Sequence, residues 1–363
     1  MNFIKINHET LKKYCTEILI KNGVTPEEAE ICSDVLVAAD LRGIPSHGTA
    51  RLDLYVDTIK AGVANVKGDI KIIKETPNSL LIDGNGKMGQ AVSFEVMNKI
   101  IEKAEKTGIA MATVKNSNHY GIAGYYAMMA LPHGMIGISM TNSAALGIPT
   151  FGTKVKFGSN PIAFSAPAKK EKAFVLDMST TVVTRGKIEV YSREEKSMPD
   201  GWTVGKDGLT TNNPKELLAG MESKDGGGGI LPLGGLGEVL GGHKGYGLGV
   251  MVDILTGVLA GSDFADNVPN TGTHLSPVSH FFAAIKVENF RDLESFKGDM
   301  DLLLENLRTT PPAVGETRVY YAGLKEYEAE EYNIKHGVDI LDKVYNMLCG
   351  LGNEFGMPPL EKI

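Results

Sequence analysis

The sequence predicts an α/β protein in which a layered α/β domain is accompanied by a helical domain. From about residue 69, short runs rich in β-branched residues alternate with segments of helical spacing, a pattern typical of helices packed on a sheet. The two ends of the chain show helical spacing instead. We therefore expect residues 1–68 to form a helical domain, joined by C-terminal helices from about residues 291–363, and residues 69–290 to form the α/β domain.

Three helices are expected in the first part of the chain. The first, "HETLKKYCTEILIKNG", has apolar residues at helical spacing and ends at Gly23. The second follows Thr25, which forms a capping box with Glu28, and has Pro26 at its first position. The third, "TARLDLYVDTIKAG", is expected to begin near Ser46.

The α/β region contains predicted strands separated by predicted helices. The strands are "IKIIKE", "SLLID", "GIAMATVK", "MIGISMTN", "NPIAFSAP", "KAFVLDMS" and "HFFAAIKV". Helices are expected at residues 90–106 and 122–131 and in the apolar segment "LGVMVDILTGVLAG". Near the C-terminus, "DMDLLLENLRTT" and "GVDILDKVYNML" are also predicted to be helical and to pack on the N-terminal helices.

The composition argues against several classes of protein. The chain has 363 residues, of which 42% are hydrophobic, so it can bury a sizeable core. A net charge of −7 and a pI near 5.7 argue against nucleic-acid binding, which requires a basic face. The sequence shows no run of 18 apolar residues and no N-terminal signal core, so no membrane span or secretion is expected. Cys15, Cys32 and Cys349 lie far apart, as in a reduced cytoplasmic protein without disulfides or a zinc site.

A glycine motif, G-x-G-x-x-G, follows the predicted strand "SLLID" and spans Gly84 to Gly89. In a Rossmann dinucleotide site, a second strand would end in an acidic residue about 20 residues further on. Here that strand is "GIAMATV", and it ends in Lys115-Asn116-Ser117-Asn118 without an acidic residue. We therefore favour a structural turn over a dinucleotide site.

Two segments carry candidate reactive side chains. His119 lies in a polar loop between a predicted strand and a predicted helix, where it could exchange protons with a ligand or serve as a hydrogen-bonded loop residue. His47, Arg51 and Tyr55 recur every four residues, so on one helix they would share a face. Such a face can bind a carboxylate, or it can be a solvated surface with a half-buried tyrosine.

Three further segments suggest anion binding. The Gly158–Pro161 loop can hold a phosphate or be a simple turn. Asp177 ends a strand and could hold a ribose, orient a histidine or cap the next segment. Lys244 lies among glycines before a helix, which favours an anion such as pyrophosphate, with a tight turn as the alternative. The sequence contains no metal-ligand spacing of cysteine and histidine, so no metal site is expected.

In this order, the motifs resemble those of the type 2 malate/L-lactate dehydrogenases, also called the sulfolactate or ureidoglycolate dehydrogenase-like family. The matching blocks extend from about residue 40 to residue 265. They are "SHGTARLDLYVDTIKAG", "DGNGKMGQAV", "NSNHYGIAGYYA", "GISMTNS", "GSNPIAFSAP", "VLDMSTTVVTRGKI", "MPDGWTVGKDGLTTNNP", "LPLGG" and "GGHKGYGLGVMVDILTGVLAG". Co-linearity of so many blocks makes the resemblance specific.

The resemblance implies a three-layer α/β/α fold with a mixed, non-Rossmann sheet, in which residues 69–290 bind the cofactor. It implies that His119 is the catalytic residue and that His47 and Arg51 lie on the substrate side, with Tyr55 close by. The implied cofactor contacts are Ser143, Asn160, Pro161, Asp177, Met178, Ser179, Lys244, Gly315, Glu316 and Thr317. Two departures stand out: Ser159 replaces the usual threonine, and Ala322 replaces a usual proline, which weakens the match at residues 315–317.

The activity implied by the resemblance is hydride transfer between a nicotinamide cofactor and a small 2-oxo or 2-hydroxy acid. Malate/oxaloacetate and L-lactate/pyruvate are the expected pairs, and NAD is the expected cofactor, with NADP as the alternative. Two other functions stay open: reduction of a cyclic imine acid, and nucleotide binding without catalysis. The resemblance also implies a homodimer, in which the substrate-side segment of one subunit could complete its neighbour's site.

Overall fold

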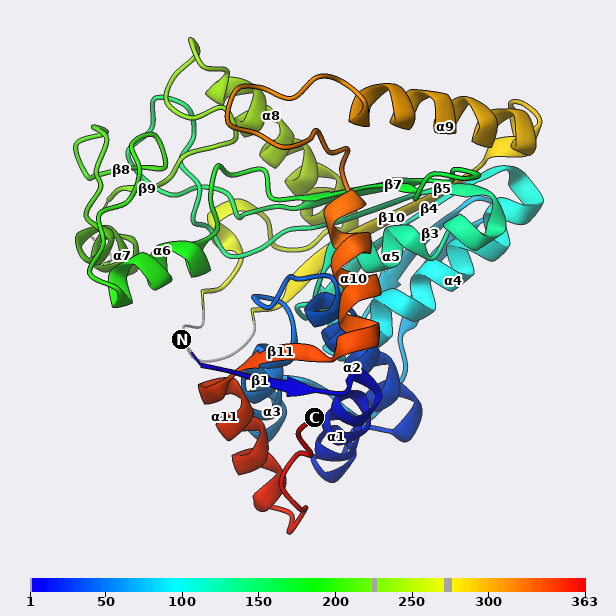
Figure 1. Cartoon of the computed structure of the whole chain (residues 1–363), viewed down its shortest axis with the longest axis horizontal. Helices are drawn as coiled ribbons and strands as arrows, with labels where there is room; N and C mark the ends of the chain where they lie inside the picture. The colour runs from blue at the N-terminus through cyan, green and yellow to red at the C-terminus, as the bar shows by residue number, and fades with distance from the viewer. Residues whose placement is uncertain (1, 224–226, 271–275) are drawn as a thin grey trace.

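The computed structural model describes residues 2–223, 227–270 and 276–363. Its centre is a seven-stranded sheet with the order β2-β3-β4-β10-β5-β6-β7 (Figure 1). The strands are β2 (Lys71–Thr76), β3 (Ser79–Asp83), β4 (Ile109–Ser117), β5 (Met135–Thr141), β6 (Ile162–Ala166), β7 (Phe174–Met178) and β10 (Val278–Lys286). Strands β3 and β4 are parallel, whereas every other neighbouring pair is antiparallel. The predicted mixed, non-Rossmann sheet is therefore confirmed.

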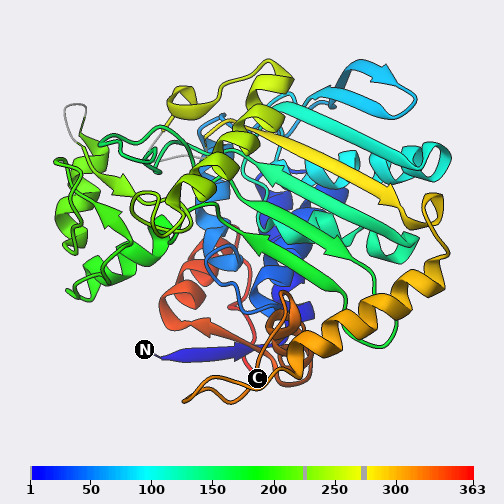
Figure 2. The same cartoon turned by 90° about the horizontal axis from the view of Figure 1, so that it is seen from above.

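Helices lie on both faces of this sheet, as Figures 1 and 2 show. On one face, α4 (Gly89–Thr107) and α5 (Ala123–Met128) pack on a core that includes Val92, Tyr126 and Phe282. On the other face lie α8 (Gly242–Asp253), the π-helical turn η3 (Ile254–Val258) and α9 (Leu293–Arg308). Val252 of α8 packs there on Phe281.

The N-terminal helices form a second core together with the end of the chain. It contains α1 (His8–Lys21), α2 (Pro26–Leu41), α3 (Leu52–Lys60) and α11 (Asp342–Asn353), and the antiparallel pair β1 (Phe3–Ile6) and β11 (Val338–Leu341). Helix α10 (Leu324–His336) joins α2, because Asn333 Nδ2 donates to Leu41 O at 2.8 Å and Arg42 pairs with Glu330. Among the C-terminal helices, α9 instead lies along the sheet (Figure 1).

A smaller lobe follows β7 and carries α6 (Arg185–Arg193), α7 (Pro214–Glu222) and the short pair β8 (Thr203–Val204) and β9 (Gly229–Ile230). Ile188, Leu217 and Ile230 form its core. The remaining short turns are η1 (Thr49–Arg51), η2 (Leu131–His133), η4 (Ala265–Asn267) and η5 (Val287–Asn289). Within the described parts of the chain, no helix is long and apolar enough to cross a membrane.

Two predicted elements are wrong in detail. The segment "GVDILDKVYNML" begins as strand β11, because Val338 and Ile340 alternate with exposed Asp339 and pair with β1. The helix expected to begin near Ser46 begins at Leu52, after a loop and the turn η1.

Candidate active site

His119 lies in the loop between β4 and α5, at the end of the sheet. The preceding residue, Asn118, is buried, and its Nδ2 donates to Gly86 O at 2.8 Å and to Lys87 O at 2.9 Å. Gly86 and Lys87 belong to the glycine motif, so this motif holds the loop that carries His119.

The backbone N–H groups of the glycine motif donate hydrogen bonds to other parts of the protein. Gly84 N and Gly86 N donate to Lys115 O and Asn116 O, each at 2.8 Å. Lys87 is buried and pairs with Glu28 at 2.5 Å. A phosphate cradle needs free backbone donors, whereas these donors and the lysine bind protein groups. The contacts support the structural turn expected from the sequence.

Replacing Gly89 by alanine is expected to displace the His119 loop. A Cβ atom there would lie 1.9 Å from Asn118 O and 2.6 Å from His119 O. Because both are backbone atoms, the loop or α4 has to move, at a cost of about 1–3 kcal/mol in unfolding free energy. Denaturant unfolding and turnover assays check this, with Gly350→Ala as control, since a Cβ at Gly350 meets nothing within 4 Å. Equal stability and turnover in the two variants would contradict the expectation.

The structure brings together the predicted catalytic residue and the three residues predicted to lie on the substrate side. The rings of His47 and His119 stack with centroids 5.5 Å apart, and the Tyr55 hydroxyl lies 2.7 Å from Nδ1 of His119. Arg51 Nε donates to Ser46 O at 2.7 Å. His47, Arg51 and His119 are half-buried, whereas Tyr55 is fully buried. Tyr55 therefore contacts His119, and its side chain has no exposed surface for contact with a ligand.

The loop that carries His47 is held by a buried carboxylate. Asp40 of α2 accepts hydrogen bonds from Thr49 N at 2.8 Å and from Thr49 Oγ1 at 2.7 Å. A Cβ at Gly48 would come within 1.8 Å of Asp40 Oδ1, so only glycine fits this position. These contacts fix the residues before η1 and turn His47 toward His119.

The surroundings keep both histidines neutral at pH 7. Burial, followed by the charge of Arg51, lowers the pKa of His47 to about 4. The pKa of His119 lies well below 6.5 because of burial first, and then because of His47, Arg51 and His280. A carboxylate bound beside Arg51 would offset this positive charge and raise the pKa of His119.

A hydrogen-bonded network joins the ends of β5 and β7 and the start of β6, at the same edge of the sheet as the end of β4 that leads to His119. Ser159 N donates to Ser143 Oγ at 3.0 Å, and Ser179 Oγ donates to Ser159 O at 3.1 Å. Asn160 is fully buried, and its Nδ2 donates to Gly249 O at 2.8 Å. Asn160 thus ties the network to α8, whereas Ser143 and Ser179 are half-exposed.

Lys244 lies in the first turn of α8 and is exposed. A Cβ at the next residue, Gly245, would lie 2.2 Å from Leu233 O, so the helix start packs directly on Leu233. Leu233 N donates to Thr180 O at 2.9 Å. These contacts place the start of α8 beside Ser179 and the network at the strand ends.

The other predicted cofactor residues are more scattered. Asp177 Oδ2 accepts from Gly124 N at 2.7 Å, so its carboxylate binds the start of α5, which precedes it in the chain, and not the next segment, as one of the alternatives from the sequence had it. Pro161 and Met178 are half-buried next to the network. Residues 315–317 (Gly315, Glu316, Thr317) are exposed in the loop between α9 and α10. A cofactor-binding role for these residues stays a prediction.

Sequence reasoning missed Asp40 and Asn118, which build the site without reacting. An acidic residue inside the apolar run "VLVAADLR" is the signal that could have found Asp40, because a buried carboxylate needs hydrogen-bond partners. For Asn118, the only indication in the sequence is its position directly before His119. Among the described residues, no cluster of three or more histidine, cysteine, aspartate or glutamate side chains could hold a metal ion.

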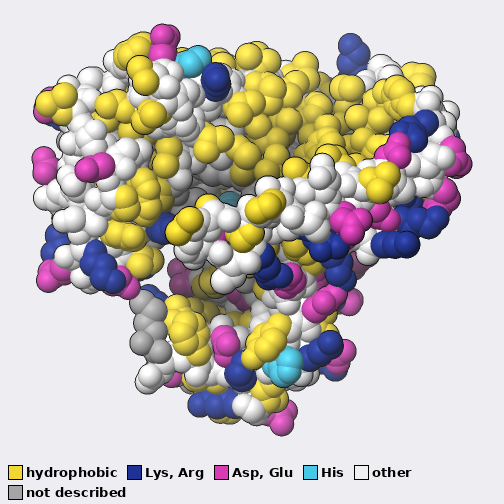
Figure 3. All heavy atoms as spheres, turned by 45° about the horizontal axis from the view of Figure 1, so that its top comes forward, with side chains coloured by type: hydrophobic (Ala, Val, Ile, Leu, Met, Phe, Trp, Pro, Cys, Tyr) yellow, Lys and Arg dark blue, Asp and Glu magenta, His cyan; other side chains and the backbone are white. Residues whose placement is uncertain are grey.

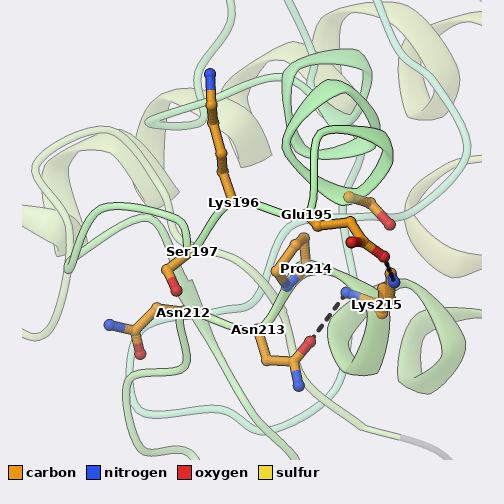
Figure 4. A pocket seen from close by; sticks show the side chains of 8 residues that line it. Glu195, Lys196, Ser197, Asn212, Asn213, Pro214 and Lys215 are labelled. Carbon is orange, nitrogen blue, oxygen red and sulfur yellow. Dashed lines mark hydrogen bonds and ion pairs between the residues drawn. The ribbon is translucent and has the colours of Figure 1, made fainter.

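A polar recess between α6 and α7 lies in the smaller lobe (Figure 4). Its charged groups are already paired, since Lys215 Nζ lies 2.8 Å from Glu195 Oε1. Asn213 Oδ1 accepts from Lys215 N at 3.1 Å and caps α7. The charged groups of this recess are paired within the protein, so we do not assign it a ligand.

Comparison with known proteins decides the family. The family model for malate/L-lactate dehydrogenase matches residues 6–349. The chain belongs to this family. It is 45% identical over 360 residues to a malate dehydrogenase of Pyrococcus abyssi, which covers 99% of this chain and 97% of the relative.

Solved structures of the malate/L-lactate dehydrogenase family have the same fold. Malate dehydrogenase from Pyrococcus horikoshii OT3 matches with a TM-score of 0.89 at 42% identity, over 99% of this chain and 97% of that one. Sulfolactate dehydrogenase from Methanocaldococcus jannaschii matches with a TM-score of 0.87 at 35% identity, over 98% of each chain. The predicted fold and family are confirmed, and the protein is a dehydrogenase that uses a nicotinamide cofactor and a small acid substrate.

Proposed function

We propose that this dehydrogenase interconverts malate and oxaloacetate with NAD, and that L-lactate and pyruvate are its second substrate pair. The observation that carries the proposal is the cluster of His119, His47 and Arg51 at the end of the sheet. A histidine that exchanges a proton beside a cation that binds a carboxylate is the arrangement that a 2-oxo acid requires. The identity to the Pyrococcus abyssi relative favours malate over lactate.

In the reductive direction, His119 donates a proton to the carbonyl oxygen of the acid while Arg51 binds its carboxylate. The donating atom is Nε2, because Nδ1 is engaged by Tyr55. When bound, the nicotinamide supplies the hydride to the carbonyl carbon. In the reverse direction, neutral His119 accepts the proton of the hydroxyl group. Proton transfer of this kind contributes about 10²–10⁴-fold to the rate.

The residues at the strand ends fit a dinucleotide. The half-exposed hydroxyls of Ser143 and Ser179 can bind ribose or phosphate oxygens, and exposed Lys244 at the start of α8 supplies positive charge. Buried Asn160 holds this surface in place through its hydrogen bond to Gly249 O. NAD is the preferred assignment and NADP the alternative.

A spectrophotometric panel tests the proposal. The loss of reduced nicotinamide absorbance is followed with oxaloacetate, pyruvate, sulfopyruvate, 2-oxoglutarate and a cyclic imine acid, each with NADH and with NADPH. We expect the highest kcat/KM for oxaloacetate with NADH. Turnover of the imine alone would show that the protein reduces the carbon–nitrogen double bond of an imine and not the carbonyl of a 2-oxo acid. Cofactor binding without any turnover would favour a nucleotide-binding role.

We also propose a homodimer and a cytoplasmic location. Apolar side chains gather on the face that carries α8 and α9 (Figure 3). Exposed members on η3, the residue after it and α9 are Ile254, Val258, Leu259, Leu302, Leu303 and Leu307. Apolar patches of this kind mark protein–protein contacts in soluble proteins.

All three cysteines are free, as expected in a reducing compartment.

Replacing Leu303 by aspartate is expected to shift the dimer toward monomer, because it would bury a charge in the contact. Light scattering after size-exclusion chromatography measures the change. Leu209→Asp is the matched control, since Leu209 is also an exposed leucine but lies in the smaller lobe. An unchanged mass for Leu303→Asp, or a monomeric wild type, would contradict the proposed interface.

A further inference from the structure

Gln90 is the second residue of α4 and directly follows the glycine motif that holds the His119 loop. Its side chain is fully buried, and within the described part of the chain its Nε2 has no hydrogen-bond partner. Its Oε1 has only a weak contact, with the thiol of Cys32 at 3.9 Å. A buried amide group left unpaired costs about 1–3 kcal/mol, so its presence needs an explanation.

The group beside the Gln90 amide is the hydroxyl of Tyr55. Burial raises the pKa of Tyr55, and the neighbouring Gln90 amide works against this rise. On its other side, the same hydroxyl lies 2.7 Å from Nδ1 of His119. Tyr55 therefore lies between Gln90 and the histidine, and its side chain is fully buried.

Neutral His119 carries its proton on Nε2. The backbone N–H of Gly121 points at Nδ1 at 3.3 Å and can only donate, so Nδ1 is an acceptor. In this state the Tyr55 hydroxyl donates to Nδ1, and its oxygen can accept from the free Nε2 of Gln90.

When His119 is protonated, the pattern has to reverse. Nδ1 then donates to the Tyr55 oxygen, so the hydroxyl proton of this buried tyrosine needs another acceptor. Gln90 offers both an acceptor and two donors on one amide, so it can serve Tyr55 in both protonation states. An apolar residue at this position would leave the hydroxyl proton unpaired whenever His119 is charged.

We propose that Gln90 is a positioning residue for His119, which acts through the Tyr55 hydroxyl to stabilise the protonated form of the histidine. This inference rests on the proposed function, because it assigns Gln90 a part in that proton transfer. It also explains why the glycine motif opens α4 at this point: the same turn holds the His119 loop through Asn118 and places Gln90 behind the histidine.

The other titratable or charged groups that face His119 come from several elements. They are His47 and Arg51 from the loop and η1, Tyr55 from α3, and His280 from β10. Tyr55 in turn faces Arg51 and Cys32. Substitution of Gln90 leaves all of these side chains in place, so its effect on His119 can be measured against an unchanged set of charges.

The test compares Gln90→Met, Tyr55→Phe and the double variant. Methionine keeps the length of glutamine without its hydrogen-bonding groups. We expect Q90M to lower kcat/KM for oxaloacetate reduction at pH 7.5 by about tenfold, the equivalent of about one unit in the pKa of His119, and to change malate oxidation much less. In the Y55F background, adding Q90M should have no further effect. Ser93→Ala, a buried α4 residue whose Oγ has no partner among the described residues, is the control and should match wild type.

Nitrogen-15 NMR of the His119 ring, titrated without substrate, measures the same protonation directly. The proposal is supported if Q90M has a lower His119 pKa than wild type while Y55F and Y55F/Q90M have the same His119 pKa. An unchanged pKa, or the same change in both backgrounds, overturns it. Because this titration needs no turnover, failure of the proposed substrates would leave the test of Gln90 intact.

Discussion

Replacing His119 by alanine is expected to lower kcat for oxaloacetate reduction by about 10²–10⁴-fold, because the proton donor is lost. The affinity for NADH should change little, since the residues proposed to bind the cofactor lie on other segments. Stopped assays of product and nicotinamide fluorescence titration measure the two quantities separately.

The matched control for this variant is His47→Asn. His47 stacks on His119 and lies 2.9 Å from the Ser46 hydroxyl, so it supports the site without holding Tyr55. We expect a smaller loss for this variant than for His119→Ala. Near-normal turnover in His119→Ala, or a larger loss in His47→Asn, would show that His119 is not the proton donor.

Replacing Arg51 by methionine is expected to raise KM for oxaloacetate by about 10–100-fold, since hydrogen bonds to a charged group contribute about 1.5–3 kcal/mol each. Arg51→Lys keeps the charge but loses the planar pair of donors, so it should lie between methionine and wild type. Steady-state kinetics measure both variants.

Arg193→Met is the control for Arg51, because Arg193 is another cation along the groove of about 800 Å³ that Arg51 also lines. Its loss should leave KM unchanged. A normal KM in Arg51→Met, together with a raised KM in Arg193→Met, would place the carboxylate elsewhere in the groove.

The α/β architecture could be predicted because each strand of the large sheet is a short apolar run bounded by turn residues. Strand β11 could not, because Val338 and Ile340 form a strand only in contact with β1, more than 300 residues away in the chain. The lobe with α6 and α7 was also missed, since α6 buries only Ile188 and its pattern is mostly polar.

The reactive residues of the site could be predicted from the sequence, but the residues that hold them in place could not. His119, His47 and Arg51 are chemically distinctive side chains in polar segments, so the sequence pointed to them. Their convergence depends on Asp40, Gly48 and Asn118, whose roles come from contacts between segments that local spacing cannot reveal. The expected shared helix face was wrong, yet the turn before α3 brings the same residues together.

The pH dependence of kcat/KM in both directions tests the central claim most directly. In the free site, the pKa of His119 lies well below 6.5. Oxaloacetate reduction needs the protonated form, which is lost as pH rises, so log kcat/KM should fall with a slope of about −1 across neutral pH. Malate oxidation needs the neutral form and should be nearly flat over the same range. A log kcat/KM for reduction that rises with pH, or rates independent of pH in both directions, would contradict proton transfer by His119.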